Sequence, residues 1–332
     1  MSSLIKEVDA RTGLAGANQM ELLLFHVGTG EVFGINVFKV REVMKCPVLT
    51  RVPDIDPRIE GMTNIRGTTV PVIGLRKALG LAGMEMGEAH TEAPGAGHLI
   101  IAEYNMNLQA FHVEGVDRIL RLSWSQIKPP PPLVRDTVRG TVTAVAMLDD
   151  GRMVLILDVE KILADICPKS DEELLAGVEA IPRLKAKRVL FADDSSVARS
   201  QIRKTLEKLG ISYLQATTGR EAWDQLLAVA EKAAAAGTLI REEIHLVLSD
   251  IEMPDMDGFT LTKQIRSDAR FADLPILLHS SLTGSCNVEK GKAVGATDYL
   301  TKFDPKNLTD TILRHCTPVP KHSAAQEDER KG

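Results

Sequence analysis

The second half of the chain alternates short apolar runs with amphipathic helical patterns, and this alternation constrains its fold most strongly. Runs of Val, Leu and Ile are typical of strands buried on both faces of a parallel sheet that helices cover. The strand patterns lie at 188–192, 211–216, 245–249, 275–279 and 298–301. The helical patterns lie near 195–209, 219–236, 258–270, 286–294 and 304–315. We therefore expect an α/β doubly wound domain with a five-stranded parallel sheet at 188–315.

Acidic and basic residues stand where the predicted strands end. Asp193 and Asp194 follow the first strand pattern, and Asp250 follows the third. Because the carboxyl ends of strands in an open α/β sheet form its ligand-binding edge, these side chains should converge there. Three carboxylates placed together repel one another unless a hard cation joins them, and Mg²⁺ prefers oxygen ligands. A single Asp could simply cap a helix, but the ordered set predicts a magnesium site.

The same edge should support phosphoryl chemistry. One carboxylate could attack a phosphoryl group to give an aspartyl phosphate, with the metal neutralising the phosphoryl charge. Lys302 follows the last strand pattern and supplies a further cation, and Ser280 follows the fourth and supplies a hydroxyl donor. The second half is therefore predicted to be a phosphorylation switch.

These residues resemble the receiver domain of two-component response regulators. The matching segments are Val189–Ser195 and Ser249–Gly258, with Ser280 and Lys302 as single matching residues. The resemblance implies a flavodoxin-like strand order and implies that Asp250 accepts phosphate from a histidine kinase. It also implies that Asp193, Asp194, Asp250 and the backbone carbonyl of Glu252 hold Mg²⁺.

The resemblance further implies that Ser280 is the switch hydroxyl and that Tyr299 is the aromatic side chain that changes its rotamer or exposure. One position departs from the family pattern. The receiver lysine is usually followed by proline, whereas Lys302 is followed by Phe303. The geometry of the loop around the lysine is therefore open.

The first half has the pattern of an all-β domain. Two hairpins are predicted, one from the runs at 22–27 and 32–37 and one from the runs at 142–148 and 153–158. Further short strand patterns lie at 69–73, 99–104 and 108–113. Many short strands with turn signals between them favour a small barrel or a pair of barrels.

Within this half, Phe33–Val43 and Gly61–Val72 resemble the CheW-like coupling domain of bacterial chemotaxis, and the match extends over residues 18–165. The resemblance implies two SH3-like five-stranded barrels without catalytic residues. It also implies binding to chemoreceptor tips and to a histidine kinase. The residues that it places in or near the partner-binding surfaces are Asn64, Arg66, Val40 and Glu42.

Composition narrows the remaining possibilities. A formal net charge of −5 argues against a nucleic-acid partner, and four scattered cysteines suggest neither a zinc site nor a disulfide framework. The N-terminus lacks the apolar core of a signal peptide, and no apolar run approaches the ~20 residues of a membrane span. We expect a cytoplasmic protein that associates with polar receptor arrays through its partners and is not inserted in the membrane.

The order of the parts resembles that of CheV-type chemotaxis adaptors, with a linker at 166–187 and a disordered tail at 316–332. The resemblance implies an adaptor, not an enzyme, that couples chemoreceptors to their kinase and adapts when Asp250 is phosphorylated. The alternative is a phosphate sink that drains the kinase through phosphorylation and hydrolysis at Asp250. An aspartyl phosphatase is disfavoured because Asp250 is followed by Ile251 and Glu252 instead of the Asp-x-Asp pattern.

Overall fold

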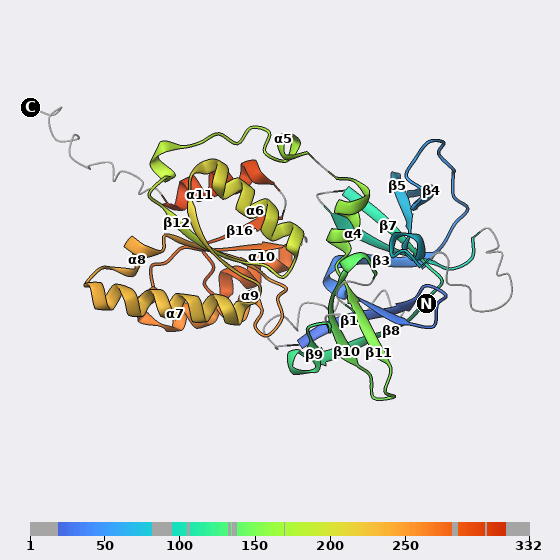
Figure 1. Cartoon of the computed structure of the whole chain (residues 1–332), viewed down its shortest axis with the longest axis horizontal. Coiled ribbons are helices and arrows are strands. Elements are labelled where there is room, and N and C mark those ends of the chain that lie inside the picture. The colour runs from blue at the N-terminus through green and yellow to red at the C-terminus, as the bar shows by residue number, and fades with distance from the viewer. Residues whose placement is uncertain are drawn as a thin grey trace, which may run out of the picture.

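The computed structural model describes residues 19–81, 95–104, 107–131, 134, 138–168, 170–280, 285–302 and 304–316. It consists of a β-rich N-terminal body and an α/β C-terminal body, joined by a connecting segment (Figure 1). Phe303 and the predicted tail beyond Cys316 lie outside the described residues. None of the helices in the described ranges is long and apolar enough to cross a lipid bilayer.

The N-terminal body contains two β-sheets, as predicted. The first has six strands, which in spatial order are β8 (Gly115–Ser123), β1 (Gln19–His26), β2 (Val32–Asn36), β11 (Met153–Leu157), β10 (Val142–Met147) and β9 (Ile127–Lys128). Both predicted hairpins are present as the antiparallel pairs β1–β2 and β10–β11. The sheet has six strands instead of five because the short β9 pairs with β10.

The second sheet has five strands. In spatial order they are β3 (Val40–Lys45), β6 (His98–Tyr104), β7 (Asn107–Val113), β5 (Thr68–Gly74) and β4 (Ile59–Ile65). The short helix α2 (Leu75–Ala78) follows β5. The 3₁₀ helix η2 (Val37–Lys39) connects β2 of the first sheet to β3 of the second. The chain therefore passes between the two sheets within three residues.

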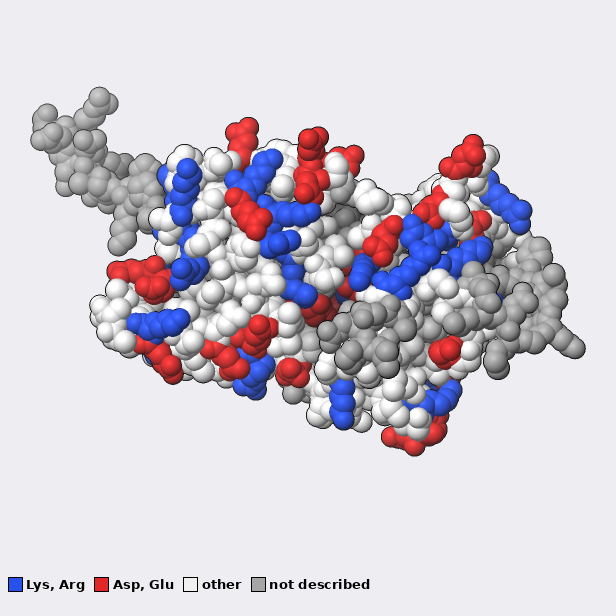
Figure 2. Space-filling model, viewed as in Figure 1, with Lys and Arg blue, Asp and Glu red and all other residues white. Residues whose placement is uncertain are grey.

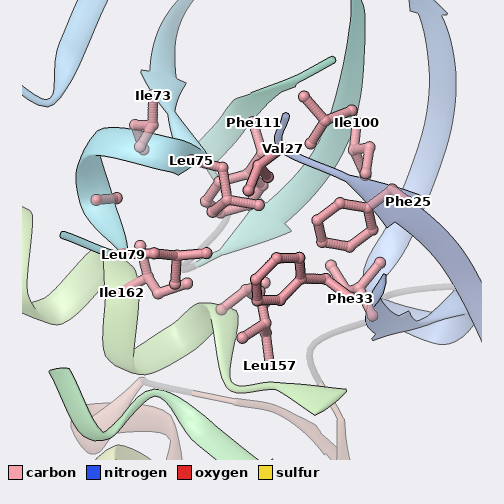
Figure 3. Close-up of a cluster of buried hydrophobic side chains, with 14 of the residues drawn as sticks. Phe25, Val27, Phe33, Ile73, Leu75, Leu79, Ile100, Phe111, Leu157 and Ile162 are labelled. Atoms are coloured by element: carbon pink, nitrogen blue, oxygen red, sulfur yellow. The ribbon is translucent and has the colours of Figure 1, made fainter. Parts of the chain in front are cut away.

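One hydrophobic core joins the two sheets. Phe25 and Phe33 of the first sheet stack with their ring centroids 6.0 Å apart, and they belong to the same buried cluster as Phe111 of the second sheet. Ile162 of helix α4 (Val159–Ile166) packs into this cluster beside the strands (Figure 3). The two sheets and α4 therefore form one domain.

The C-terminal body is built on a five-stranded, all-parallel sheet. Its spatial order is β13 (Ser212–Ala216), β12 (Arg188–Ala192), β14 (Leu246–Asp250), β15 (Ile276–Ser280) and β16 (Asp298–Thr301). In chain order this is 2-1-3-4-5, the flavodoxin-like order that the sequence resemblance implied. The parallel register places Ala192 beside Ser249 and Asp250 beside His279, so the carboxyl ends of the three central strands are neighbours.

Helices cover both faces of this sheet (Figure 1). They are α6 (Ser196–Leu209), α7 (Gly219–Ala236), α8 (Ile240–Glu243), α9 (Gly258–Ser267), α10 (Ser285–Ala293) and α11 (Pro305–Cys316), with the 3₁₀ turn η6 (Ala269–Phe271) after α9. Alternate residues of each strand point to opposite faces. Leu190 therefore packs in one core with α7 and α9, and Val189 packs in another with α6 and α11.

Residues 166–187, predicted to be a linker, begin with the predicted capping box. Ser170 accepts a hydrogen bond from the Glu173 backbone N–H at the start of α5 (Asp171–Leu174). The 3₁₀ turn η5 (Pro182–Leu184) follows, and the side chains of Val178 and Leu184 are buried in the core of the C-terminal body. The end of this segment therefore packs on the domain that it leads into.

Candidate phosphoacceptor and metal site

The three predicted carboxylates meet at the carboxyl edge of the parallel sheet. Asp250 is the last residue of β14, and Asp193 and Asp194 follow β12 directly. Each offers a carboxylate oxygen, and these three atoms lie within 4.8 Å of one another. Asp193 and Asp250 are almost completely buried, whereas Asp194 is half-buried. The sheet therefore assembles the carboxylates that its sequence pattern predicted.

Lys302 supplies the cation of this cluster. Its Nζ lies 2.7 Å from Asp250 Oδ2 and 3.0 Å from Asp193 Oδ2. The backbone of Lys302 is fixed as well, since its N–H donates to the Ser280 carbonyl at the end of the neighbouring strand. A buried lysine would be strongly unfavourable without such partners. The arrangement therefore requires the carboxylates and the lysine together.

Backbone groups orient the carboxylates. The Ser195 N–H donates to Asp193 Oδ1 at 2.8 Å, and the Ile251 N–H donates to Asp250 Oδ1 at 2.7 Å. The Arg199 guanidinium, one turn into α6, donates to the backbone carbonyls of Asp193 and Asp194. These bonds hold both strand ends in place, so the carboxylates are positioned before any ligand binds.

Two carboxylate oxygens remain available for a metal. Within the described part of the chain, Asp193 Oδ2 and Asp194 Oδ1 are buried and have no hydrogen-bond partner, although Lys302 is close to the former. Buried oxygens of this kind carry a desolvation cost that a hard cation relieves. The residues present therefore fit Mg²⁺, with Asp193 and Asp194 as direct or water-mediated ligands. A ligand role for the Glu252 carbonyl stays a prediction.

The electrostatics of the cluster favour an added cation. Burial raises the pKa of Asp250 well above its usual range, and the neighbouring carboxylates add to this effect while Lys302 opposes it. Burial also raises the pKa of Asp194, with Asp193 contributing. Burial alone would lower the pKa of Lys302, but the surrounding carboxylates hold it well above its usual value. The site thus holds more negative charge than one ammonium balances.

Close backbone packing after Asp250 limits which residues can stand at the start of α9. A Cβ added at Gly258 would lie 2.1 Å from the Asp250 carbonyl oxygen, which no real side chain can do. Asp257 caps the following helix by accepting from the Thr260 N–H. Gly258 therefore allows α9 to begin directly against the end of β14.

The two predicted switch residues lie on adjacent strands. Ser280 ends β15, is almost completely buried, and stands opposite Thr301 in the parallel register. Tyr299 in β16 is half-buried and packs on the cluster formed by Ile251, Phe259 and Leu278. Ser280 lies on the strand next to that of Asp250, whereas Tyr299 lies one strand further out, and their switching roles remain predictions.

Sequence reasoning missed three residues of this site. His279 lies inside β15 with its Nε2 3.5 Å from Asp193 Oδ2, and burial together with Lys302 lowers its pKa to about 4. A histidine in an otherwise apolar run was the signal that could have revealed it. Lys39 and Glu160 of the N-terminal domain also contribute to the electrostatics of the acidic cluster, and no local pattern marks them.

The predicted partner-binding residues occupy one hairpin and the strand near it. At the β4–β5 turn, Arg66 and Gly67 have φ values of 52° and 89°, and the Gly67 N–H donates to Asn64 Oδ1 at 2.9 Å. The Arg66 side chain is 75% exposed and donates to Glu42 Oε2 at 2.7 Å. Val40 is different, because its side chain is buried in the core and cannot form part of a surface.

Comparisons with known proteins agree with both halves of this description. The model of the CheW-like domain matches residues 21–167, and the model of the response regulator receiver domain matches residues 189–313. The fold and the site thus define a class of protein in which a CheW-like domain precedes a receiver domain.

Curated relatives align with this chain along most of their length. The chain is 31% identical to chemotaxis protein CheV3 of Helicobacter pylori over 284 residues, covering 85% of this chain and 88% of the relative. It is 26% identical to CheV1 of the same organism, and that match covers 94% of this chain and 98% of the relative. A crystal structure of the scaffolding protein TtCheW from Thermoanaerobacter tengcongensis matches 43% of this chain and 86% of its own, with 27% identity and a TM-score of 0.37. The chain belongs to the CheV family of chemotaxis proteins.

Proposed function

We propose that this protein is a chemotaxis adaptor that couples chemoreceptors to a histidine kinase, and that phosphorylation of Asp250 tunes the coupling so that the response adapts. The observation that carries the proposal is the buried cluster of Asp193, Asp250 and Lys302 on a chain whose other domain is CheW-like. The adaptor domain provides the contacts with partners. The receiver domain provides the chemistry that changes them.

The phosphoryl transfer uses Asp250 as the nucleophile. One of its carboxylate oxygens forms a bond to phosphorus as the bond between phosphorus and the nitrogen of the kinase phosphohistidine breaks, and the released imidazole takes up a proton. Bound Mg²⁺ supplies charge neutralisation at the phosphoryl oxygens. Lys302 adds a second positive charge within hydrogen-bond distance of Asp250. Asp193 and Asp194 hold the metal.

The readout follows from the position of Ser280 and Tyr299. Ser280 lies at the end of the strand next to Asp250, where its hydroxyl can donate to a phosphoryl oxygen. Ser280 and Tyr299 lie on neighbouring strands, and Tyr299 packs on Ile251 and Phe259, so movement of Ser280 toward the phosphoryl group is expected to change the face near Tyr299. A ligand shifts such an equilibrium only through contacts that differ between the two states.

The partner contacts are assigned to the CheW-like domain. Arg66, Glu42 and Asn64 form a charged and amide-bearing surface at the β4–β5 turn, which fits polar receptor or kinase surfaces. Over the receiver half of the face in Figure 2, Lys and Arg side chains are interspersed with Asp and Glu. The mixed charges on this face of the receiver suit protein partners better than a polyanion such as a nucleic acid. We place the protein in the cytoplasm, at receptor arrays.

Phosphotransfer from radiolabelled kinase tests the proposal. Wild-type protein with Mg²⁺ is expected to take up label, and Asp250→Asn is expected to take up none. Asp255→Asn is the matched control, because Asp255 is exposed and its φ of 63° suits Asn equally well. Equal labelling of wild type and Asp250→Asn would refute the assignment. Rapid label turnover without any change in receptor or kinase binding would favour a phosphate sink instead.

A further inference from the structure

A charged pair of the CheW-like domain lies against the acidic site of the receiver. Lys39, the last residue of η2, has its Nζ 3.3 Å from Oε1 of Glu160, the second residue of α4. The Lys39 side chain is 12% exposed and that of Glu160 is 2% exposed. Long charged side chains are rarely this buried unless they are paired. Their burial indicates that the neighbouring domain covers them.

Glu160 lies at the start of a helix that packs against the receiver. Helix α4 contacts α6, and Ser195 caps the start of α6. Burial would raise the pKa of Glu160, but Lys39 and Lys302 lower it to about 2, so this carboxylate is ionised. The charge of Glu160 therefore acts on Lys302, the lysine that pairs with Asp250.

Lys39 also interacts electrostatically with a carboxylate of the receiver site. Burial would lower its pKa, but Glu160, the receiver residue Asp194 and Asp158 hold it above the usual value for lysine. The ammonium group of Lys39 thus supplies positive charge to Asp194, whose Oδ1 has no hydrogen-bond partner among the described residues. This is the place where a metal would supply positive charge.

The domains also meet through an apolar contact beside this pair. A small cavity of about 20 Å³ separates Phe38 and Trp124 of the CheW-like domain from Ile251 and Phe259 of the receiver. A volume of that size holds about one water molecule, so the two surfaces fit closely. Ile251 and Phe259 belong to the cluster that supports Tyr299.

We propose that the face formed by η2 and the start of α4 is a docking surface for the phosphoacceptor face of the receiver, with Lys39 competing with Mg²⁺ for Asp194. The docked form keeps the CheW-like domain on the acidic site, and metal binding with phosphorylation favours the undocked form. By linkage, Mg²⁺ weakens docking by the same factor by which docking weakens Mg²⁺ binding. This inference rests on the proposed phosphoacceptor role of Asp250, whose regulation it specifies.

Calorimetric titration with MgCl₂ tests the competition. Lys39→Met is expected to bind Mg²⁺ roughly three- to tenfold more tightly than wild type, because it removes a nearby positive charge. Lys45→Met is the matched control, since Lys45 is an exposed lysine of the same domain and should leave the affinity unchanged. Equal affinities for wild type and Lys39→Met would overturn the competition. Absence of Mg²⁺ binding in all three proteins would overturn the proposed site itself.

The native tryptophans allow undocking to be observed. Trp124 lies at the interface and Trp223 lies in α7 away from it, so Trp223→Phe leaves a reporter of docking. Mg²⁺ with beryllium fluoride, which mimics an aspartyl phosphate, should shift the Trp124 emission to the red as water reaches the ring. The radius of gyration of the wild-type chain in solution scattering should increase under the same conditions.

Fluorine NMR distinguishes failure of the docking inference from failure of the proposed function. Bound fluoroberyllate without any change in emission or in radius of gyration would overturn the docking inference and leave the phosphoacceptor function standing. If no fluoroberyllate binds, the proposed function fails.

Discussion

At the scale of single residues, the receiver site depends on a balance of buried charges. Lys302 is the only described cation that lies within 4 Å of both Asp193 and Asp250. Each of these groups would be costly to bury alone, and the cluster persists because each compensates the others. Mg²⁺ bound to this cluster would act on the same carboxylates as Lys302, so loss of either cation should increase the dependence on the other.

Replacement of Lys302 tests this balance. Lys302→Met is expected to destabilise the receiver by about 3 kcal/mol, because it leaves buried carboxylates without their counter-charge. Added MgCl₂ should recover much of that loss. Urea unfolding followed by Trp223 emission, in a Trp124→Phe background, measures both effects. Lys306→Met, at an exposed position of α11, should change little; a loss of stability insensitive to Mg²⁺ would contradict the prediction.

A second residue-scale prediction concerns pH. Burial raises the pKa of Asp158 from 3.8 to about 6, with Glu160 and Asp194 adding to the effect and Lys39 opposing it. As pH rises, the Asp158 carboxyl group loses its proton in the unfolded chain before it does so in the folded protein. The free energy of unfolding is therefore expected to fall by about 3 kcal/mol between about pH 4 and pH 6.

Asp158→Asn should flatten this dependence. Asn can still cap α4 by accepting from the Lys161 N–H, but it carries no charge to bury. The urea midpoint of the Trp124 transition, measured across this pH window in the Trp223→Phe background, reports the difference. If the variant and its parent lose the same stability between pH 4 and pH 6, Asp158 is not the group responsible.

At the scale of elements, the site depends on how tightly α9 begins against β14. Gly258→Ala is expected to destabilise the receiver by roughly 1–3 kcal/mol, because the new methyl group meets the Asp250 carbonyl. It should also slow phosphotransfer by moving Asp250. Gly291→Ala in α10 is the control, since its nearest neighbour is the flexible end of Leu278. Equal stability of both variants in urea unfolding would contradict this packing.

The elements also show how much the sequence could reveal. In the receiver, the three central strands are apolar and buried, and the three carboxylates, Ser280 and Lys302 stand at or just after strand ends, so local pattern alone predicted the sheet and the acidic cluster. In the CheW-like domain, β3, β4 and β8 were missed as strands. Their residues are only partly buried and carry charges such as Glu60 and Arg118, which disrupt the alternation that reveals a strand.

At the scale of the whole molecule, the two domains share one site. Lys39 and Glu160 are separated from Asp250 by long stretches of chain, so no spacing rule could predict that they approach it. Their contribution arises only when the complete fold places α4 against α6 and η2 close to Ile251 and Phe259 of the receiver. The acidic pocket of the receiver is therefore partly built by the CheW-like domain, which the receiver is proposed to regulate.

The most direct test of the account is kinase activity in reconstituted receptor–kinase complexes. Wild-type protein, Asp250→Asn and the control Asp255→Asn are each added with and without a small-molecule phosphodonor. We predict that all three proteins support coupling without the donor, and that the donor changes kinase activity with wild type and Asp255→Asn but not with Asp250→Asn. The same donor-dependent change with Asp250→Asn would contradict the claim that phosphorylation of Asp250 tunes the coupling.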